Sequence, residues 1–230
     1  MTTQEDAEHY LKLHTKDLLE RFAGLDAHPA QSEPHTIFMA GAPGAGKTEA
    51  SQKIISNIPQ LAQAVRIDAD EIKEWLPQYT GKNSDDVQGA SVLGLQRLYD
   101  SVLKQKQHAI VDGTFSEYRH AKENIERSLS RNRITIIIYI YQDPRHAWAF
   151  TKLRAEKYGR SIPKDYFIDT YFKSIETVNQ IKGEFGNRIY LYFIEKNYLH
   201  EIVKFKDNVQ SVDSYIKKKY TKSSLEKIIV

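Results

Sequence analysis

Hydrophobic residues along the chain fall into short apolar runs separated by segments of helical periodicity. The apolar runs are residues 36–40, 64–67, 108–111, 134–141 and 189–194. Run 134–141, ITIIIYIY, is continuously apolar, which is typical of a strand covered on both faces. Between the runs, apolar residues recur every three or four positions, which predicts helices. These recurring sets are Val92, Leu95, Leu98 or Tyr99, and Val102; Ala121, Ile125 and Leu129; and Phe167, Tyr171, Ile175 and Val178.

Strands that alternate with helices predict an α/β fold: a five-stranded parallel sheet with right-handed crossovers, covered by helices on both faces. Residues 1–35 are predicted to hold a helix over 5–22 and a loop, and residues 36–197 form the α/β core. Lysines become frequent in residues 198–230, where we predict a helical extension with a solvated face. We therefore expect one domain. The apolar set of the 5–22 helix is Tyr10, Leu11, Leu13, Leu18 and Leu19.

Composition excludes several classes of protein. The 230 residues are 40% hydrophobic and 27% charged, as in a soluble globular domain, and no apolar run approaches the ~20 residues of a membrane helix. The polar, acidic start is unlike a signal peptide. The absence of Cys rules out disulfides and suits a reducing cytoplasm. A net charge of +3 does not by itself indicate nucleic acid.

The segment GAPGAGKT, which follows the first predicted strand, matches the phosphate-binding pattern G-x-x-x-x-G-K-[ST]. Its glycines let backbone N–H groups curl around phosphate oxygens. Lys47 brings a charge to the β- and γ-phosphates, and Thr48 offers Mg²⁺ a hard oxygen ligand. A helix predicted from residue 48 points its positive end at the same anion. The residues expected to contact ATP are Gly41, Ala42, Gly44, Ala45, Gly46, Lys47 and Thr48.

Polar residues follow the second and third predicted strands, where ligands of such sheets bind. Asp68 and Asp70 follow the second, and Asp70 is our candidate for the base that accepts a hydroxyl proton and for a contact with Mg²⁺. The alternative is that both acids only cap a helix. Asp112 and Thr114 follow the third strand and suit a polar substrate or metal-bound water, unless they form a simple turn.

Two arginines flank a segment marked by Gly and Pro after the fourth predicted strand. Arg154 lies in a predicted helix, and Arg160 lies in the sequence GRSIP that follows. Arginines on a closing lid neutralise the charge that develops during phosphoryl transfer. The alternative for either residue is ordinary surface solvation.

Four motifs together resemble the zeta toxin family: GAPGAGKT, IDADEIKEWLPQY, AIVDGT and FTKLRAEKYGRSIP, in that order over residues 37–197. The resemblance implies a P-loop kinase of a bacterial toxin–antitoxin system, which phosphorylates a hydroxyl of UDP-N-acetylglucosamine or another UDP-sugar. It also implies a small helical antitoxin partner. By the same resemblance Lys47 is the P-loop lysine, Thr48 holds the metal, Asp70 is the general base, and Arg154 and Arg160 are the lid arginines.

The acceptor side of the resemblance is altered. The family's Glu of the [DE]-G-T motif is Asp112, whereas its threonine is kept as Thr114. A family glutamate falls at Gln96, and a family arginine falls on Ser116, close to Arg119. The phosphate-handling half is therefore intact. Two alternatives remain: a kinase with another acceptor, such as an antibiotic, a nucleoside or an RNA end, or a non-catalytic NTP-binding regulatory module.

Overall fold

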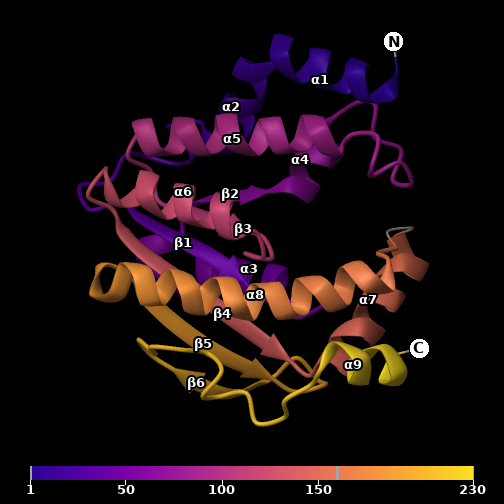
Figure 1. The fold of residues 1–230 in the computed structure, drawn as a ribbon. Helices are drawn as coiled ribbons and strands as arrows, with labels where there is room; N and C mark the ends of the chain where they lie inside the picture. Colours follow the sequence, from indigo (N-terminus) through magenta and orange to yellow (C-terminus); the bar gives the residue numbers. More distant parts are fainter. Residues whose placement is uncertain (1, 159–160, 230) are drawn as a thin grey trace.

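A twisted six-stranded sheet forms the centre of the computed structural model, which describes residues 2–158 and 161–229 (Figure 1). The strands lie in the order β2-β3-β1-β4-β5-β6. Their bounds are β1 His35–Ala40, β2 Val65–Asp68, β3 Ala109–Asp112, β4 Ile134–Gln142, β5 Tyr190–Lys196 and β6 Ile202–Lys206. The first five strands run parallel, which confirms the five strands predicted from the apolar runs.

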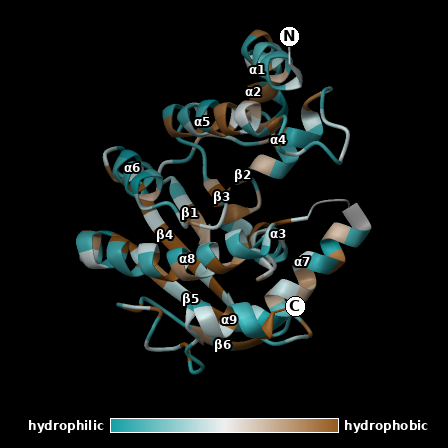
Figure 2. Ribbon diagram, turned by 45° about the vertical axis from the view of Figure 1, so that its right-hand side comes forward, coloured by the Kyte–Doolittle hydropathy of each residue, from teal (hydrophilic) through white to brown (hydrophobic). Residues whose placement is uncertain are grey.

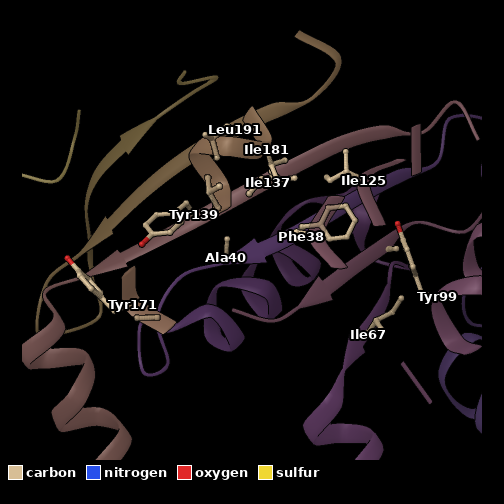
Figure 3. Packing of buried hydrophobic residues seen from close by; sticks show 14 of the residues in the cluster. Phe38, Ala40, Ile67, Tyr99, Ile125, Ile137, Tyr139, Tyr171, Ile181 and Leu191 are labelled. Atoms are coloured by element: carbon tan, nitrogen blue, oxygen red, sulfur yellow. The ribbon is translucent and has the colours of Figure 1, made fainter. Parts of the chain in front are cut away.

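Helices cover both faces of the sheet, as predicted. Strand side chains alternate between the faces, so Phe38 and Ala40 pack towards α5, α6 and α8, whereas Ile37 and Met39 pack towards α3 (Figure 3). Hydrophobic colouring gathers on the strands, and the outer helix α6 is largely hydrophilic (Figure 2). The helix bounds are α1 Thr3–Leu13, α2 Thr15–Ala23, α3 Lys47–Asn57, α4 Ala69–Trp75, α5 Gln88–Lys104, α6 Tyr118–Leu129, α7 Pro144–Tyr158, α8 Lys164–Phe185 and α9 Lys222–Ile228, with 3₁₀ turns at Pro59–Leu61 and Gly186–Arg188.

The sixth strand was not predicted. β6 pairs antiparallel with β5 at the sheet edge, in a segment expected to be a helical extension, and of that expected helix the structure has only the short α9. Asn197 builds the hairpin, since its side-chain oxygen accepts from the backbone N–H groups of Leu199 and Glu201 at 2.9 and 3.0 Å. β6 has only five residues, and two of its lysines look like a solvated helix face in the sequence. The sequence signal for this strand was therefore weak.

The predicted N-terminal helix is divided into α1 and α2 at His14. The Thr15 hydroxyl donates to the carbonyl of Leu11 at 2.9 Å, an interaction that competes with helix hydrogen bonds and often bends helices. Leu11 and Leu18 are fully buried, and both helices lie against α5 (Figure 1). Leu13 remains 68% exposed. No helix in the described part of the chain has the length and apolar content needed to cross a bilayer.

A buried polar cluster joins β1, β3 and β4 at their amino-terminal ends, at the opposite end of the sheet from the glycine loop. The His35 backbone N–H donates to Nδ1 of His108 at 3.0 Å. Arg133 donates to the Thr36 hydroxyl at 2.6 Å and to the backbone carbonyls of His35 and Gln107. Burial, together with the nearby His35 and Arg133, lowers the pKa of His108 from 6.5 to about 4. His108 is therefore neutral in the folded protein at pH 7.

We expect His108 to make the folded state sensitive to acid. Because its folded pKa lies below its unfolded pKa, its contribution is complete above pH 6.5 and is lost as the pH falls towards 4, by about 2–3 kcal/mol. His108→Asn keeps an acceptor for the His35 N–H but removes the titration. Urea denaturation at pH 7 and pH 4 should therefore show a smaller loss for the variant than for the wild type. Equal losses in the two proteins would contradict this.

Candidate active site

The loop between β1 and α3 approaches its neighbours so closely that it requires glycine. Gly41, Gly44 and Gly46 have φ angles of 134°, 74° and 82°, in the region that other residues rarely adopt. A Cβ at Gly41 would lie 2.3 Å from the carbonyl oxygen of Ile140, and one at Gly44 would lie 2.1 Å from that of Ala147. The loop is therefore fixed between the end of β4 and the start of α7. The strand before it, β1, and the helix after it, α3, are those that the motif predicted.

Lys47 opens α3 and turns back over the loop. Its Nζ donates to the carbonyls of Gly41 and Ala42 at 2.9 and 2.7 Å. Burial lowers the pKa of Lys47 to about 8; Asp112 opposes this shift, and the nearby Arg154 adds to it. An ammonium group is thus held at the loop, within the electrostatic reach of two acids, Asp112 and Asp68, and of one arginine from other elements.

Lys196, at the end of β5, is a contact that the sequence interpretation missed. Its buried Nζ donates to the carbonyl of Gly46 at 2.7 Å, so the fifth strand is tied to the loop. A Cβ at Gly46 would lie 2.7 Å from this Nζ and 3.2 Å from Nδ1 of His200. Lys196 lies two residues past the last apolar run, so the strand-end rule applied to the other strands would have found it.

Two carboxylates meet at the ends of β2 and β3. Asp68 and Asp112 are directly paired across the two strands, and Arg66, two residues before Asp68, donates to both of them. Ser51 of α3 donates to Asp112 at 3.1 Å and accepts from Nε of Arg66 at 3.1 Å. Glu71 also pairs with Arg66. The acids after the second and third strands therefore lie together beside α3.

Asp68 and Asp70 differ in their positions. Asp68 is the N-cap of α4 and accepts from the Asp70 N–H at 2.9 Å, as the capping alternative proposed. Burial, followed by the charge of Asp112, raises the pKa of the Asp68 carboxyl to about 6. Asp70 lies in the first turn of α4 and is half-buried. Only one of the two acids is thus committed to the cap.

Of the predicted acceptor-side residues, three gather next to the loop and one does not. The carbonyl of Thr114 accepts from the Gly41 N–H at 3.1 Å, and the hydroxyls of Thr114 and Ser116 lie 2.9 Å apart. Asp112 lies beside them in sequence and contacts α3. Gln96 is exposed on α5, and no hydrogen bond within the described ranges joins it to the other three.

Arg154 lies on α7 and is exposed, and its charge contributes to the lowered pKa of Lys47. Arg160 lies outside the described residues. One pocket, of about 240 Å³, is lined by Lys196, His146 and Tyr198 beside the loop. Another, of about 420 Å³, lies between α8 and residues 213–220 and contacts none of the predicted site residues.

The whole arrangement therefore places a glycine loop, a lysine, a group of carboxylates and an arginine at the carboxyl edge of one parallel sheet. A sequence model of zeta toxins matches residues 21–210. The chain belongs to the zeta toxin family. The match extends beyond the motif-bearing residues 37–197 on both sides, so it includes the end of α2 and all of β6.

Solved structures share this zeta toxin fold. A chain of the PezAT chromosomal toxin–antitoxin system of Streptococcus pneumoniae is 14% identical, with a TM-score of 0.65, over 98% of this chain and 87% of that one. A chain of the AvrRxo1-ORF1:AvrRxo1-ORF2 complex with sulphate ions is 16% identical, with a TM-score of 0.69, over 90% and 71% of the two chains. A chain of the same complex with ATP is also 16% identical, with a TM-score of 0.65, over 90% of this chain and 71% of that one. At these identities the likeness concerns the fold. A search of curated protein sequences gave no significant match.

We expect Gly44→Ala to weaken ATP binding about tenfold or more. The left-handed backbone costs an alanine roughly 1–2 kcal/mol, and the new Cβ would also collide with the carbonyl of Ala147, so the loop must shift. Calorimetric titration with ATP measures the effect. Gly113→Ala is the matched control, because nothing lies within 4 Å of its added Cβ. Equal affinities for ATP in the two variants would show that the loop geometry does not govern binding.

Proposed function

We propose that this zeta toxin family member is an ATP- and Mg²⁺-dependent kinase that phosphorylates a hydroxyl of a UDP-sugar such as UDP-N-acetylglucosamine. The observation that supports it best is the meeting of the glycine loop, Lys47, and the carboxylates of β2 and β3 at one sheet edge. A regulatory module that only binds NTP has no use for acids aligned beside its phosphate loop. The kinase is therefore favoured over that alternative.

The loop and α3 receive the triphosphate in this proposal. Backbone N–H groups of the glycine loop, to which Pro43 contributes none, and the Lys47 ammonium bind its oxygens. Within the described ranges no three His, Cys, Asp or Glu side chains form a metal cage, which fits Mg²⁺ held by few protein ligands, here Thr48 and Asp70. Bound Mg²⁺ would neutralise charge on the β- and γ-phosphates.

Asp70 is the proposed general base. Its carboxylate accepts the proton of the acceptor hydroxyl as that oxygen attacks the γ-phosphorus, and the bond from the γ-phosphorus to the β–γ bridging oxygen breaks, so that ADP leaves. Arg154, together with Arg160, is proposed to stabilise the negative charge that develops on the transferred group. The exposed position of Arg154 on α7 suits a group that moves towards the loop when substrates are bound.

The acceptor is the open part of the proposal. Thr114 and Ser116 present paired hydroxyls near the loop, which suits a polyhydroxylated ligand such as a sugar. The exposed Gln96 stands where the family resemblance leads us to expect an acid. This difference favours a second candidate function, a kinase with the same fold that acts on an antibiotic, a nucleoside or an RNA end.

The decisive experiment incubates the protein with ATP, Mg²⁺ and separate pools of UDP-sugars, nucleosides, aminoglycosides and RNA oligonucleotides. Mass spectrometry then looks for the mass of one added phosphate, with Lys47→Ala as the inactive control. Phosphorylation of a UDP-sugar supports the proposal. Phosphorylation of a compound in another pool would show that the kinase acts on that compound instead. ATP binding without any phosphorylated product would leave the regulatory module as the better account.

Asp70→Asn should lower kcat by about 10²–10⁴ with little change in ATP affinity, because it removes the base but keeps the shape. Asp68→Asn should act differently, since Asp68 holds the cap of α4 and the Arg66 pair. It should lower the melting temperature more than Asp70→Asn does. Rapid-quench kinetics and thermal melting separate the two effects. A severe kcat loss in Asp68→Asn alone would assign the base to Asp68.

We also propose a cytoplasmic toxin whose partner is a small helical antitoxin that docks on the N-terminal helices. Leu13 on α1 and Leu25 beyond α2 are 68% and 54% exposed, whereas Leu11 and Leu18 are buried against α5. Structures of toxin–antitoxin complexes with this fold support the idea of such a partner.

Expression of the wild-type chain alone should therefore slow the growth of a bacterial host, and Lys47→Ala should relieve the effect. Co-expression with the neighbouring small open reading frame should restore growth. Leu13→Asp should then weaken the rescue without changing kinase activity. Normal growth with active wild-type enzyme would indicate a kinase that is not a toxin.

A further inference from the structure

Arg66 is a buried cation that no family motif accounts for. It lies on β2, its side chain is 9% exposed, and it contacts three acids. One nitrogen donates to Asp112 at 2.8 Å, and the same nitrogen also pairs with Asp68. A second nitrogen pairs with Glu71, and Nε donates to Ser51 at 3.1 Å. All three guanidinium nitrogens are therefore engaged.

The acids need such a partner because of the strand register. Asp68 and Asp112 lie directly opposite each other on β2 and β3, with side chains only 13% and 5% exposed. Like charges in this arrangement repel, and a buried charge without a partner is costly. Arg66 shares the face of β2 with Asp68, so its planar fork reaches both acids together.

Ser51 extends the network to α3. Its fully buried hydroxyl accepts from Arg66, and its single O–H lies within hydrogen-bond distance of both Asp112 at 3.1 Å and the carbonyl of Thr48 at 2.9 Å. Thr48 is the proposed metal ligand, so the network connects the carboxylate pair with the first turn of α3. Arg66 can therefore influence the metal position without touching the nucleotide.

A divalent cation is the other partner that would suit this carboxylate pair, since carboxylate oxygens are preferred ligands of Mg²⁺ and Mn²⁺. We propose that Arg66 is a positioning residue that takes the place of a free divalent cation: it neutralises and fixes Asp68 and Asp112, so that the metal binds only together with the nucleotide phosphates. This inference rests on the proposed kinase function. It predicts weak metal binding by the nucleotide-free protein.

The test measures Mn²⁺ binding without nucleotide, by electron paramagnetic resonance of free Mn²⁺. Arg66→Met removes the cation while keeping much of the side-chain volume, and it should bind Mn²⁺ at least about tenfold more tightly than the wild type, because the two carboxylates lose their guanidinium partner and become available to the metal. Mn²⁺ should also raise the melting temperature of Arg66→Met and leave that of the wild type unchanged. Arg119→Met, at an 88% exposed arginine paired with Glu123, is the matched control and should behave as the wild type does.

Arg66→Lys keeps the test valid if Arg66→Met does not fold. A lysine retains the charge but cannot bond Asp68, Asp112 and Ser51 together, so its Mn²⁺ affinity should lie between those of wild type and Arg66→Met. The proposal is overturned if every folded Arg66 variant binds Mn²⁺ with an affinity within twofold of the wild type and has a lowered melting temperature. Arg66 would then be only a structural counter-ion. Since ATP and acceptor are absent, this outcome is independent of the acceptor screen. A wild-type protein that phosphorylates nothing would overturn the proposed function and leave the Mn²⁺ result standing.

Discussion

The contact between the glycine loop and the end of β4 is the constraint on which the site depends. The backbone at Gly41 and Gly44 lies so close to the carbonyls of Ile140 and Ala147 that no Cβ fits. This packing fixes where α3 begins and therefore where Lys47 stands. The adjacent strand β3 is hydrogen-bonded to β1, so Asp112 is brought to the side of the same loop. Position in the sheet, more than any one side chain, assembles the site.

Charged side chains of both signs lie together at the carboxyl ends of the strands, where they largely neutralise one another. The carboxylates of Asp68 and Asp112 are held by Arg66, while Lys47 faces loop carbonyls and feels both Asp112 and Arg154. Burial works against the charges of Lys47 and Asp68, since it lowers the pKa of the lysine and raises that of the acid. Binding of a polyanion and a metal ion would rearrange the ion pairs of such a site. The proposed phosphoryl transfer depends on charges placed in this way.

One contact of the glycine loop, His200, comes from a part of the chain that was predicted to be helical and instead belongs to a β-hairpin. The hairpin of β5 and β6 places Lys196 and His200 at the end of the glycine loop. A helical extension, as expected for residues 198–230, would not bring the chain back along β5. The turn at Asn197, built by side-chain hydrogen bonds to two backbone N–H groups, therefore influences the site as well as the sheet edge.

Local patterns in the sequence determined the five parallel strands, the helices on both faces and the glycine loop, because apolar periodicity and glycine requirements act over a few neighbouring residues. They also placed Asp68, Asp70, Asp112 and Thr114 at strand ends. They did not reveal Arg66 as the partner of two acids, because its role depends on the register that sets Asp68 opposite Asp112. Nor did they show that Gln96 is exposed, since the outward direction of α5 at that residue follows from how α1, α2 and α4 pack on the helix. Contacts between residues far apart in the chain are decided only when the sheet and its helices come together.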